Sequence, residues 1–571
     1  MKKSVWVTVA ALLLCLLMVL PASGVGTDAS SSQAANVQEI GAAIDEFLES
    51  HKDNHAAVAV AVFEGETDVY SRYFGTVDKD GQVPLDADSV LEWGSTTKLT
   101  VWVAAMQLWE KGLLDPDADL GTYLPNGFFK NLSFDTPITM MNLMNHNAGF
   151  QETTFVLEVE SEDEIISLGE YLATYQPEQV FEPGTVVAYS NWGAALAGYV
   201  VECIAGVPFY QYAQENIFAP LGMTRTAIAS DLSDNSYVQK KRREFVSYMP
   251  DGTLSEENNK VFILPYPAGM CTSTLSDFTT FAKALLNRDN RLLGEEGFAK
   301  LYSPSLLYTG TDKARLYHGF LVDYEFASPI VGHDGNTAGG SSRLLLDFEN
   351  NRGMVVLTNQ LGGSLYRTKM AELVFGKTEH NIPIDGYYVP ARNVFEGKMK
   401  LLYNLFLIRH CHITSEMVGD MYINILPDRF EISTTDYLVP TENYWLRDGL
   451  AVAWFVLAGL ALLSFVAHTV WLIIKRRRGQ GLDRFNLLVG MYGLCVGLSL
   501  LAIIPEFPAP ASLIWCGLLV IGGILLTVYL IIKRKMEKPN LLTKISYWHA
   551  WSLLLALAMT VLNYVIWDLM L

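Results

Sequence analysis

The chain has 571 residues, of which 50% are hydrophobic and 18% are charged, and its formal net charge is −20 at pH 7. This length predicts more than one structural unit, and so apolar a chain is not expected to be disordered. The negative charge argues against nucleic acid as a partner, because phosphate binding needs a basic surface. Six cysteines in a chain of this length do not form a disulfide scaffold.

The first residues have the pattern of a secretory signal. Lys2 and Lys3 precede an apolar run, Val5–Leu20, and the small residues of Pro21–Gly24 follow it. We predict a signal peptide over residues 1–24, with an uncleaved anchor as the alternative. Residues 25–36, rich in Ser and Ala, are expected to form a flexible leader.

A domain is predicted over residues 37–376, with strand patterns at both ends and helix patterns between them. Hairpins are expected from Ala56–Phe63 with Asp68–Phe74, and from Ser342–Phe348 with Gly353–Thr358. Helices are expected over Val37–Ser50, Leu99–Gly112, Trp192–Ala205 and Leu275–Asn287, with the second strongly amphipathic. This arrangement predicts an α+β fold in which both ends of the domain build one antiparallel sheet beside a helical region.

Residues 384–447 have short alternating runs, including Met421–Ile425 and Phe430–Ser433, and many aromatic residues. We predict a small β-rich juxtamembrane module there. No residue in it suggests catalysis.

The last part of the chain, residues 450–571, is predicted to form four transmembrane helices. The four apolar runs are Leu450–Ile474, Phe485–Ile504, Leu513–Ile532 and Tyr547–Ile566. Each is close to the ~20 residues that cross a bilayer. Basic residues follow the first and third runs, at Lys475–Arg478 and Lys533–Lys535, whereas Pro505–Ser512 has none. The positive-inside rule then predicts a multi-pass protein of the cell membrane, with the lipid bilayer as a partner and the domain outside.

A nucleophile pattern lies at the start of the helix that ends near Gly112. Ser95 and Lys98 are three residues apart and therefore share one helix face. A lysine whose pKa is lowered by burial can accept the serine proton, and the helix N-terminus favours a developing anion. Ser-Thr-Thr before a helix is also an ordinary N-cap, so the pattern needs support from elsewhere in the chain.

Two further motifs give that support: Tyr189-Ser190-Asn191 and His333-Asp334-Gly335-Asn336. With Ser95 and Lys98 they resemble, in order, the three motifs of the serine β-lactamase and penicillin-binding protein superfamily. The resemblance is closest to the branch of class C β-lactamases, D-aminopeptidases and esterases. Met144–Phe150, Pro220–Met223 and Pro267–Met270 are similar to other conserved segments of that branch.

The resemblance implies a role for each matching residue. Ser95 would be the acylated nucleophile, and Lys98 with Tyr189 would be a general-base pair in which ammonium and phenolate stabilise each other. Asn191 would hold Lys98 and contact the substrate amide. His333 would orient Tyr189 or the substrate, and Gly335 would also belong to the substrate-binding set. The backbone N–H groups of Ser95 and Asn336 would form the oxyanion hole.

The sequence therefore predicts a membrane-anchored serine hydrolase that acts on a small-molecule or peptide substrate. The resemblance implies D-amino-acid peptides, cell-envelope esters or acylated natural-product precursors as substrates. The alternative is a non-catalytic ligand sensor or transport partner with the same fold. No cluster of His, Cys, Asp and Glu suggests a zinc site, so no metal or cofactor is expected. Protein partners remain open.

Overall fold

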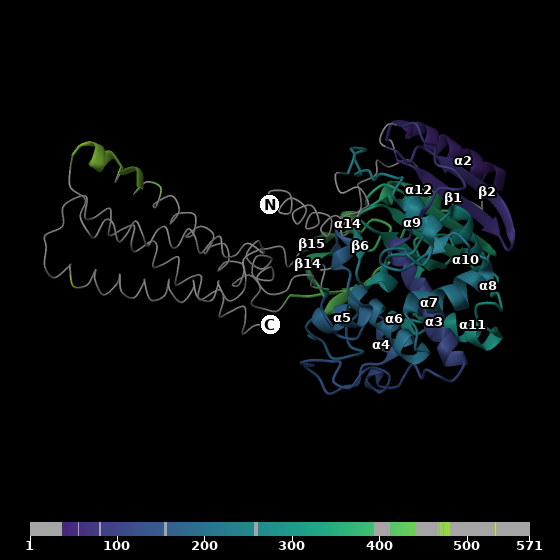
Figure 1. Cartoon of the computed structure of the whole chain (residues 1–571), viewed down its shortest axis with the longest axis horizontal. Coiled ribbons are helices and arrows are strands. Elements are labelled where there is room, and N and C mark those ends of the chain that lie inside the picture. The colour runs from purple at the N-terminus through teal and green to yellow at the C-terminus, as the bar shows by residue number, and fades with distance from the viewer. Residues whose placement is uncertain are drawn as a thin grey trace. The chain divides into compact units, whose positions relative to one another are not determined.

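A computed structural model (Figure 1) describes residues 37–392, apart from 55, 79–80, 153–156 and 256–260, then 411–440, 466, 469–471, 473–479 and 532. The chain divides into two compact units. The first holds Met1–Gly386, Pro390–Val394 and His412–Leu438, and the second holds Tyr387–Val389, Phe395–Cys411 and Val439–Leu571. All the contacts reported below lie within the first unit.

The predicted signal peptide, the leader and nearly all of the four predicted spans lie outside the described residues. Within the described residues, no single helix has the length and apolarity to cross a bilayer. Two helices, Asn191–Ala205 and Phe209–Leu221, meet that test only together, and they are bent by 80° relative to one another.

An eight-stranded sheet forms the framework, in the order β2-β1-β13-β12-β11-β10-β9-β8. Its strands are β1 (Val58–Glu64), β2 (Thr67–Phe74), β8 (Leu306–Leu307), β9 (Ala314–Tyr317), β10 (Phe320–Asp323), β11 (Ile330–Asn336), β12 (Ser341–Asp347) and β13 (Arg352–Thr358). β1 pairs antiparallel with β13, with Val58 opposite Thr358. The predicted α+β fold, with one antiparallel sheet built from both ends of the domain, is confirmed.

The two faces of this sheet belong to two separate cores. In β1, Val58, Val60 and Val62 pack in the core that also contains residues of α2 (Val37–Ser50) and α12 (Ser364–Phe375). Alternate residues of the same strand, such as Ala59, face the larger core shared with the helical region. This alternation is what the period of two in a strand requires. Figure 1 shows α2 and α12 near β1 and β2.

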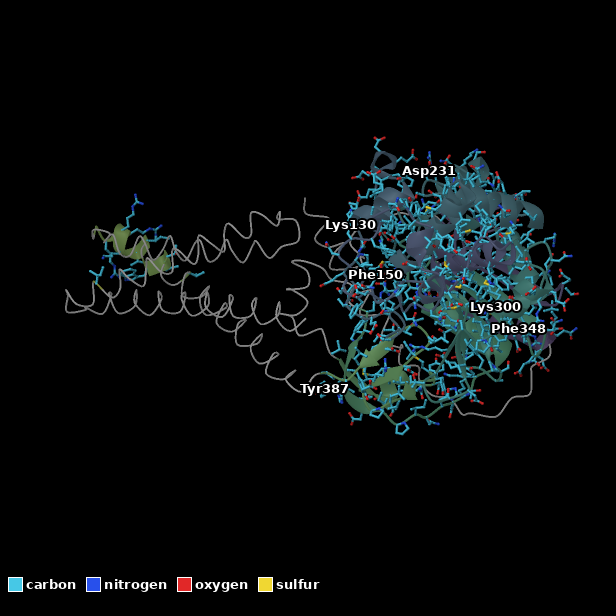
Figure 2. The ribbon with its side chains drawn as sticks, turned by 90° about the horizontal axis from the view of Figure 1, so that it is seen from below. Lys130, Phe150, Asp231, Lys300, Phe348 and Tyr387 are labelled. Carbon is cyan, nitrogen blue, oxygen red and sulfur yellow. The ribbon has the colours of Figure 1, made fainter. Side chains whose placement is uncertain are left out.

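The helical region contains most of the remaining elements. Its helices are α3 (Lys98–Glu110), α4 (Met140–Met144), α5 (Leu168–Thr174), α6 (Asn191–Ala205), α7 (Phe209–Ala213), α8 (Ala219–Leu221), α9 (Ser236–Arg242), α10 (Leu275–Leu286) and α11 (Glu295–Leu301). Two small sheets join β3 (Leu91–Glu92), β7 (Thr272–Ser273) and β5 (Thr226–Ala227), and β4 (Glu158–Val159) with β6 (Phe262–Ile263). Phe150, labelled in Figure 2, packs against Trp192 of α6 with ring centroids 4.8 Å apart.

The helix α3 differs from its prediction in one respect. Every residue from Lys98 to Leu108 is buried, so α3 is not amphipathic. The cause is that α6 and α11 pack against it, together with the short 3-10 helix Tyr266–Ala268. A helix covered on all sides needs no polar face.

The β-rich segment contains β14 (Asp385–Pro390), β15 (Cys411–Thr414), α14 (Ser415–Val418), β16 (Asn424–Ile425), β17 (Arg429–Glu431) and β18 (Asp436–Leu438). β17 pairs antiparallel with both β16 and β18. The Asp436 carboxylate lies 2.8 Å from the Arg315 guanidinium of β9, and both side chains are only 2% exposed. This buried ion pair attaches β18 directly to the domain that carries the sequence motifs.

Candidate active site

Ser95 lies at the junction between β3 and α3, on the short 3-10 helix Gly94–Thr97. Gly94 has φ +55°, and a Cβ atom there would lie 2.5 Å from the backbone nitrogen of Asn336. A Cβ atom on Gly335 would likewise lie 1.8 Å from the Trp93 carbonyl oxygen. Only glycine permits this approach, which places the backbone of Asn336 in β11 directly beside the serine segment. The predicted oxyanion donors, Ser95 and Asn336, are therefore neighbours.

Lys98 occupies the first position of α3 and is fully buried. Its Nζ lies 2.9 Å from Ser95 Oγ, 2.8 Å from Asn191 Oδ1 and 2.7 Å from the carbonyl oxygen of Ala268. Burial lowers the pKa of Lys98 well below its usual value. The predicted contact between Asn191 and Lys98 is present, and the Pro267–Met270 segment supplies the third partner.

Tyr189 immediately precedes α6, whose N-terminus is capped by the Ser190 hydroxyl accepting from the Gly193 N–H at 2.8 Å. Lys98 Nζ lies 5.0 Å from the centroid of the Tyr189 ring. The buried Tyr189 hydroxyl meets no hydrogen-bond criterion with any described residue.

Burial acts on the protonation states of both Tyr189 and Lys98. Burial raises the pKa of Tyr189, although the Ser95 hydroxyl and the Arg392 guanidinium act in the opposite direction. Because burial also lowers the pKa of Lys98, the resting site favours a neutral amine and a neutral phenol. The ammonium–phenolate pair, in which Lys98 and Tyr189 stabilise each other, stays a prediction for the state formed during proton transfer.

His333 lies in β11 and is 4% exposed, and its ring centroid is 5.9 Å from that of Tyr189. Burial, reinforced by Lys98, lowers the pKa of His333 to about 4, so the imidazole is neutral near pH 7. Its Nδ1 lies 2.6 Å from the carbonyl oxygen of Asp334, which can only accept, so Nδ1 carries the proton. Nε2 therefore carries a lone pair, and it has no hydrogen-bond partner among the described residues. It can accept a hydrogen bond from the Tyr189 hydroxyl or from a substrate.

The Asp334 carboxylate forms ion pairs with two arginines. Its carboxylate lies 2.9 Å from Arg343 and 3.4 Å from Arg367. Burial raises the pKa of Asp334, but the two guanidinium groups outweigh it and hold the pKa below its usual value. The negative charge beside the third motif is thus compensated within the protein.

The structure adds two site residues that the sequence analysis missed. Glu152 is fully buried and accepts the backbone N–H of Asn191 at 2.5 Å. Arg392 lies 3.7 Å from the same carboxylate, and its guanidinium carbon is 5.4 Å from the centroid of the Tyr189 ring. Neither residue belongs to a recognisable motif.

His146 contacts Tyr189 from another side, with ring centroids 4.5 Å apart, and accepts the Ser190 N–H on Nδ1 at 3.3 Å. Among the described residues, no group of three or more His, Cys, Asp or Glu side chains is arranged to hold a metal ion.

A sequence model of the family described as "Beta-lactamase" matches residues 40–378. Penicillin-binding protein 4* of Bacillus subtilis is 24% identical over 371 residues, which is 60% of this chain and 75% of that protein. Lovastatin esterase of Penicillium rubens is 32% identical over 200 residues, which is 31% of this chain and 49% of the esterase.

Among solved structures, the octameric penicillin-binding protein homologue of Pyrococcus abyssi superposes with a TM-score of 0.50 and 19% identity. The superposition covers 69% of this chain and 87% of the archaeal one. At this identity, the likeness supports the fold alone.

Proposed function

We propose that this chain, which belongs to the beta-lactamase family of serine hydrolases, cleaves an amide or ester through an acyl-enzyme on Ser95. Members of this family, among them amidases, esterases and penicillin-binding proteins, are enzymes, and this chain is a serine hydrolase. The assignment of individual residues, the substrate and the attachment to a membrane are parts of the proposal.

Acylation begins with neutral Lys98, which takes the proton of Ser95 as Oγ attacks the substrate carbonyl carbon. The carbonyl oxygen becomes an oxyanion that accepts from the N–H groups of Ser95 and Asn336, where one such donor typically contributes about 3 kcal/mol. The tetrahedral intermediate then expels the leaving group, which takes a proton from the Tyr189 hydroxyl. The extra proton on Lys98 passes to the Tyr189 phenolate, and both groups return to their neutral forms.

Deacylation reverses these roles with water in place of the leaving group. Lys98 first takes the Tyr189 proton, and the Tyr189 phenolate then takes a proton from water as the oxygen attacks the acyl carbon. The intermediate collapses, and Ser95 Oγ recovers its proton from Lys98. The acid product leaves, and no cofactor is consumed.

One observation carries this proposal: the buried Lys98 amine contacts Ser95 Oγ at 2.9 Å and Asn191 Oδ1 at 2.8 Å. Burying a lysine amine without a compensating acidic partner is costly, and a purely structural site would be better served by an apolar side chain. A buried amine within hydrogen-bonding distance of a serine hydroxyl instead favours nucleophilic catalysis.

For the substrate, we propose a D-amino-acid peptide, a cell-envelope ester or an acylated natural-product precursor. Support comes from relatives that are named an esterase and a penicillin-binding protein. Neutral His333 supplies no cation at the third motif. The site is therefore less suited to β-lactams, for which the specialised enzymes of the resembling family have lysine at this position.

We further propose that the domain lies outside the cell and is anchored by the apolar runs between Leu450 and Ile566. The support is in the sequence: the apolar N-terminal run Val5–Leu20 and the basic residues at Lys475–Arg478 and Lys533–Lys535 agree on one orientation.

The test is covalent labelling of the purified full-length protein with a fluorophosphonate and a fluorescent penicillin. Wild type is expected to be labelled, and Ser95→Ala is expected to remain unlabelled with an unchanged melting temperature. A panel of D-peptides, esters and β-lactams then identifies the substrate class. Folded wild type that neither reacts nor turns over any of them would favour the ligand sensor.

A further inference from the structure

The chain returns to Tyr189 after the end of the family match at residue 378. The Tyr189 N–H donates to the carbonyl oxygen of Thr434 at 3.1 Å, and the Asp436 N–H donates to that of Val187 at 2.8 Å. The Ala391 N–H in turn donates to the carbonyl oxygen of Asp436 at 2.8 Å. Backbone hydrogen bonds on both sides of β18 thus fix residue 391 near the catalytic tyrosine and bring Arg392 beside it.

The Arg392 side chain is well placed to act on that tyrosine. Its guanidinium carbon lies 5.4 Å from the Tyr189 ring centroid, within the range of a cation–π contact. Glu152 holds it at 3.7 Å, and the two side chains are 23% and 0% exposed. Arg392 Nε is buried and has no hydrogen-bond partner among the described residues. Among the described residues, Glu152 is the one ion-pair partner of Arg392, and the backbone hydrogen bond of Ala391 places the arginine beside Tyr189.

We propose that Arg392 is a positioning residue of the active site, which presents a fixed positive charge to Tyr189 during the proton transfers of the proposed hydrolysis. This inference rests on the proposed function, because it assigns a group that acts through Tyr189. It means that the segment after the family domain completes the catalytic site.

Within the part of the chain that the structure describes, six charged or titratable groups surround Tyr189. These groups are Lys98 of α3, His146 after α4, Glu152, His333 and Asp334 of β11, and Arg392. The two histidines have lowered pKa values because they are buried, so they are neutral near pH 7. Asp334 is paired with Arg343 and Arg367. Because Lys98 is neutral at rest, the local field is set by Glu152 and Arg392.

The sign of the Arg392 effect follows from Coulomb's law. A fixed cation stabilises the Tyr189 phenolate that forms when the leaving group takes its proton, and it destabilises the ammonium form of Lys98. Arg392 accordingly lowers the pKa of both groups, whereas Glu152 raises the pKa of both. With Arg392 in place, Lys98 stays neutral to a lower pH and Tyr189 gives up its proton more readily.

The experiment measures the labelling rate of Ser95 by a fluorophosphonate as a function of pH, with the full-length protein. Arg392→Gln and Arg392→Met both remove the charge, with side chains of different polarity so that at least one preserves the packing. The acid limb of the rate profile is expected to move upward by about one pH unit, which is a roughly ten-fold slower reaction on that limb. Arg392→Lys keeps the charge and is expected to restore most of the shift.

Arg429→Gln is the matched control. Arg429 lies on β17 in the same segment, donates to the Thr185 carbonyl oxygen at 3.2 Å and pairs with the Asp436 carboxylate at 3.2 Å, and among the described residues it has no recorded contact with Tyr189. Its loss is expected to leave the pH midpoint unchanged. The inference would be overturned if a neutral Arg392 variant kept the wild-type midpoint of the labelling-rate profile, or if Arg429→Gln shifted that midpoint equally. Either result would leave the proposed function unaffected. Folded wild type that is not labelled at any pH would overturn both.

Discussion

The amine of Lys98 lies 2.8 Å from the side-chain oxygen of Asn191, although 93 residues separate them in the chain. The contact joins the first residue of α3 to the first residue of α6, so the packing of two core helices sets the position of the proposed base. An amide oxygen holds the amine without adding a charge, and this leaves burial free to lower the pKa of Lys98.

Asn191→Asp should therefore slow acylation at neutral pH. A carboxylate at this distance stabilises the ammonium form and raises the pKa of Lys98, so the acid limb of kcat/KM moves to higher pH and activity recovers as the pH rises. Asn191→Ala is the control, because it removes the contact with Lys98 without adding a charge. It should lower the acylation rate but leave the acid limb of the kcat/KM profile nearly in place. The pH dependence of kcat/KM with a chromogenic ester measures both, and an unshifted Asp variant would contradict the assignment of Lys98 as base.

Lys98→Ala and Tyr189→Phe should each lower the acylation rate by roughly 10²–10⁴-fold, the usual contribution of general acid–base catalysis. Since the two groups exchange protons in one relay, the double variant should be little slower than the slower single variant. Burst-phase kinetics of the four proteins test this. Multiplied effects would show that the two groups act independently, and normal acylation by Tyr189→Phe would remove Tyr189 from the relay.

His333→Lys should keep the fold and shift preference toward substrates that carry a carboxylate. A lysine ammonium can pair with that group, whereas neutral His333 only offers the acceptor Nε2. Competition between matched esters with and without a carboxylate gives the ratio of kcat/KM values, with His333→Gln as the uncharged control. The same ratio in all three proteins would mean that residue 333 does not face the substrate.

Asp436→Asn should destabilise the domain by about 3 kcal/mol, because it leaves the buried Arg315 guanidinium without its counter-charge. Asp88→Asn is the control, since the Asp88 and Arg225 side chains are 59% and 43% exposed and an exposed ion pair contributes little to stability. Thermal unfolding of the full-length protein should show a melting temperature several degrees lower for Asp436→Asn alone. Equal melting temperatures would show that β18 is not needed to stabilise the body.

Topology gives a further prediction. Protease added to spheroplasts should digest residues 25–447 and leave the loop Lys475–Arg484 intact, because basic loops stay in the cytoplasm. Antibodies against tags in the two regions would follow the digestion. A protected domain with a cleaved loop would contradict both the signal peptide and the proposed orientation.

Local sequence patterns were sufficient for much of the framework. The helix over Val37–Ser50 and the two terminal hairpins were predicted because hydrophobic periodicity and turn residues act over a few positions. The motif residues Ser95, Lys98, Tyr189 and Asn191 were found because the short patterns together occur in the order of one known family, and the structure brings them together.

Glu152 and Arg392 could not be predicted in the same way. The chain has 61 acidic and 41 basic residues, and neither residue is marked by its neighbours in sequence. The position of Arg392 depends on the backbone hydrogen bonds from β18 to Val187 and Ala391, and that of Glu152 on the N–H of Asn191, and these contacts join distant parts of the chain. For the same reason, the complete burial of α3 follows from the elements packed around it and not from its own periodicity.

The central claim is that Ser95 carries the acyl group during turnover. The most direct measurement is peptide mass mapping of the full-length protein, acid-quenched in the first milliseconds of reaction with a slowly deacylating ester. The account predicts that the acyl mass appears on the peptide that contains Ser95 as the leaving group is released, and that Ser95→Ala acquires none. Turnover without an adduct on that peptide, or an adduct and undiminished turnover in Ser95→Ala, would contradict it.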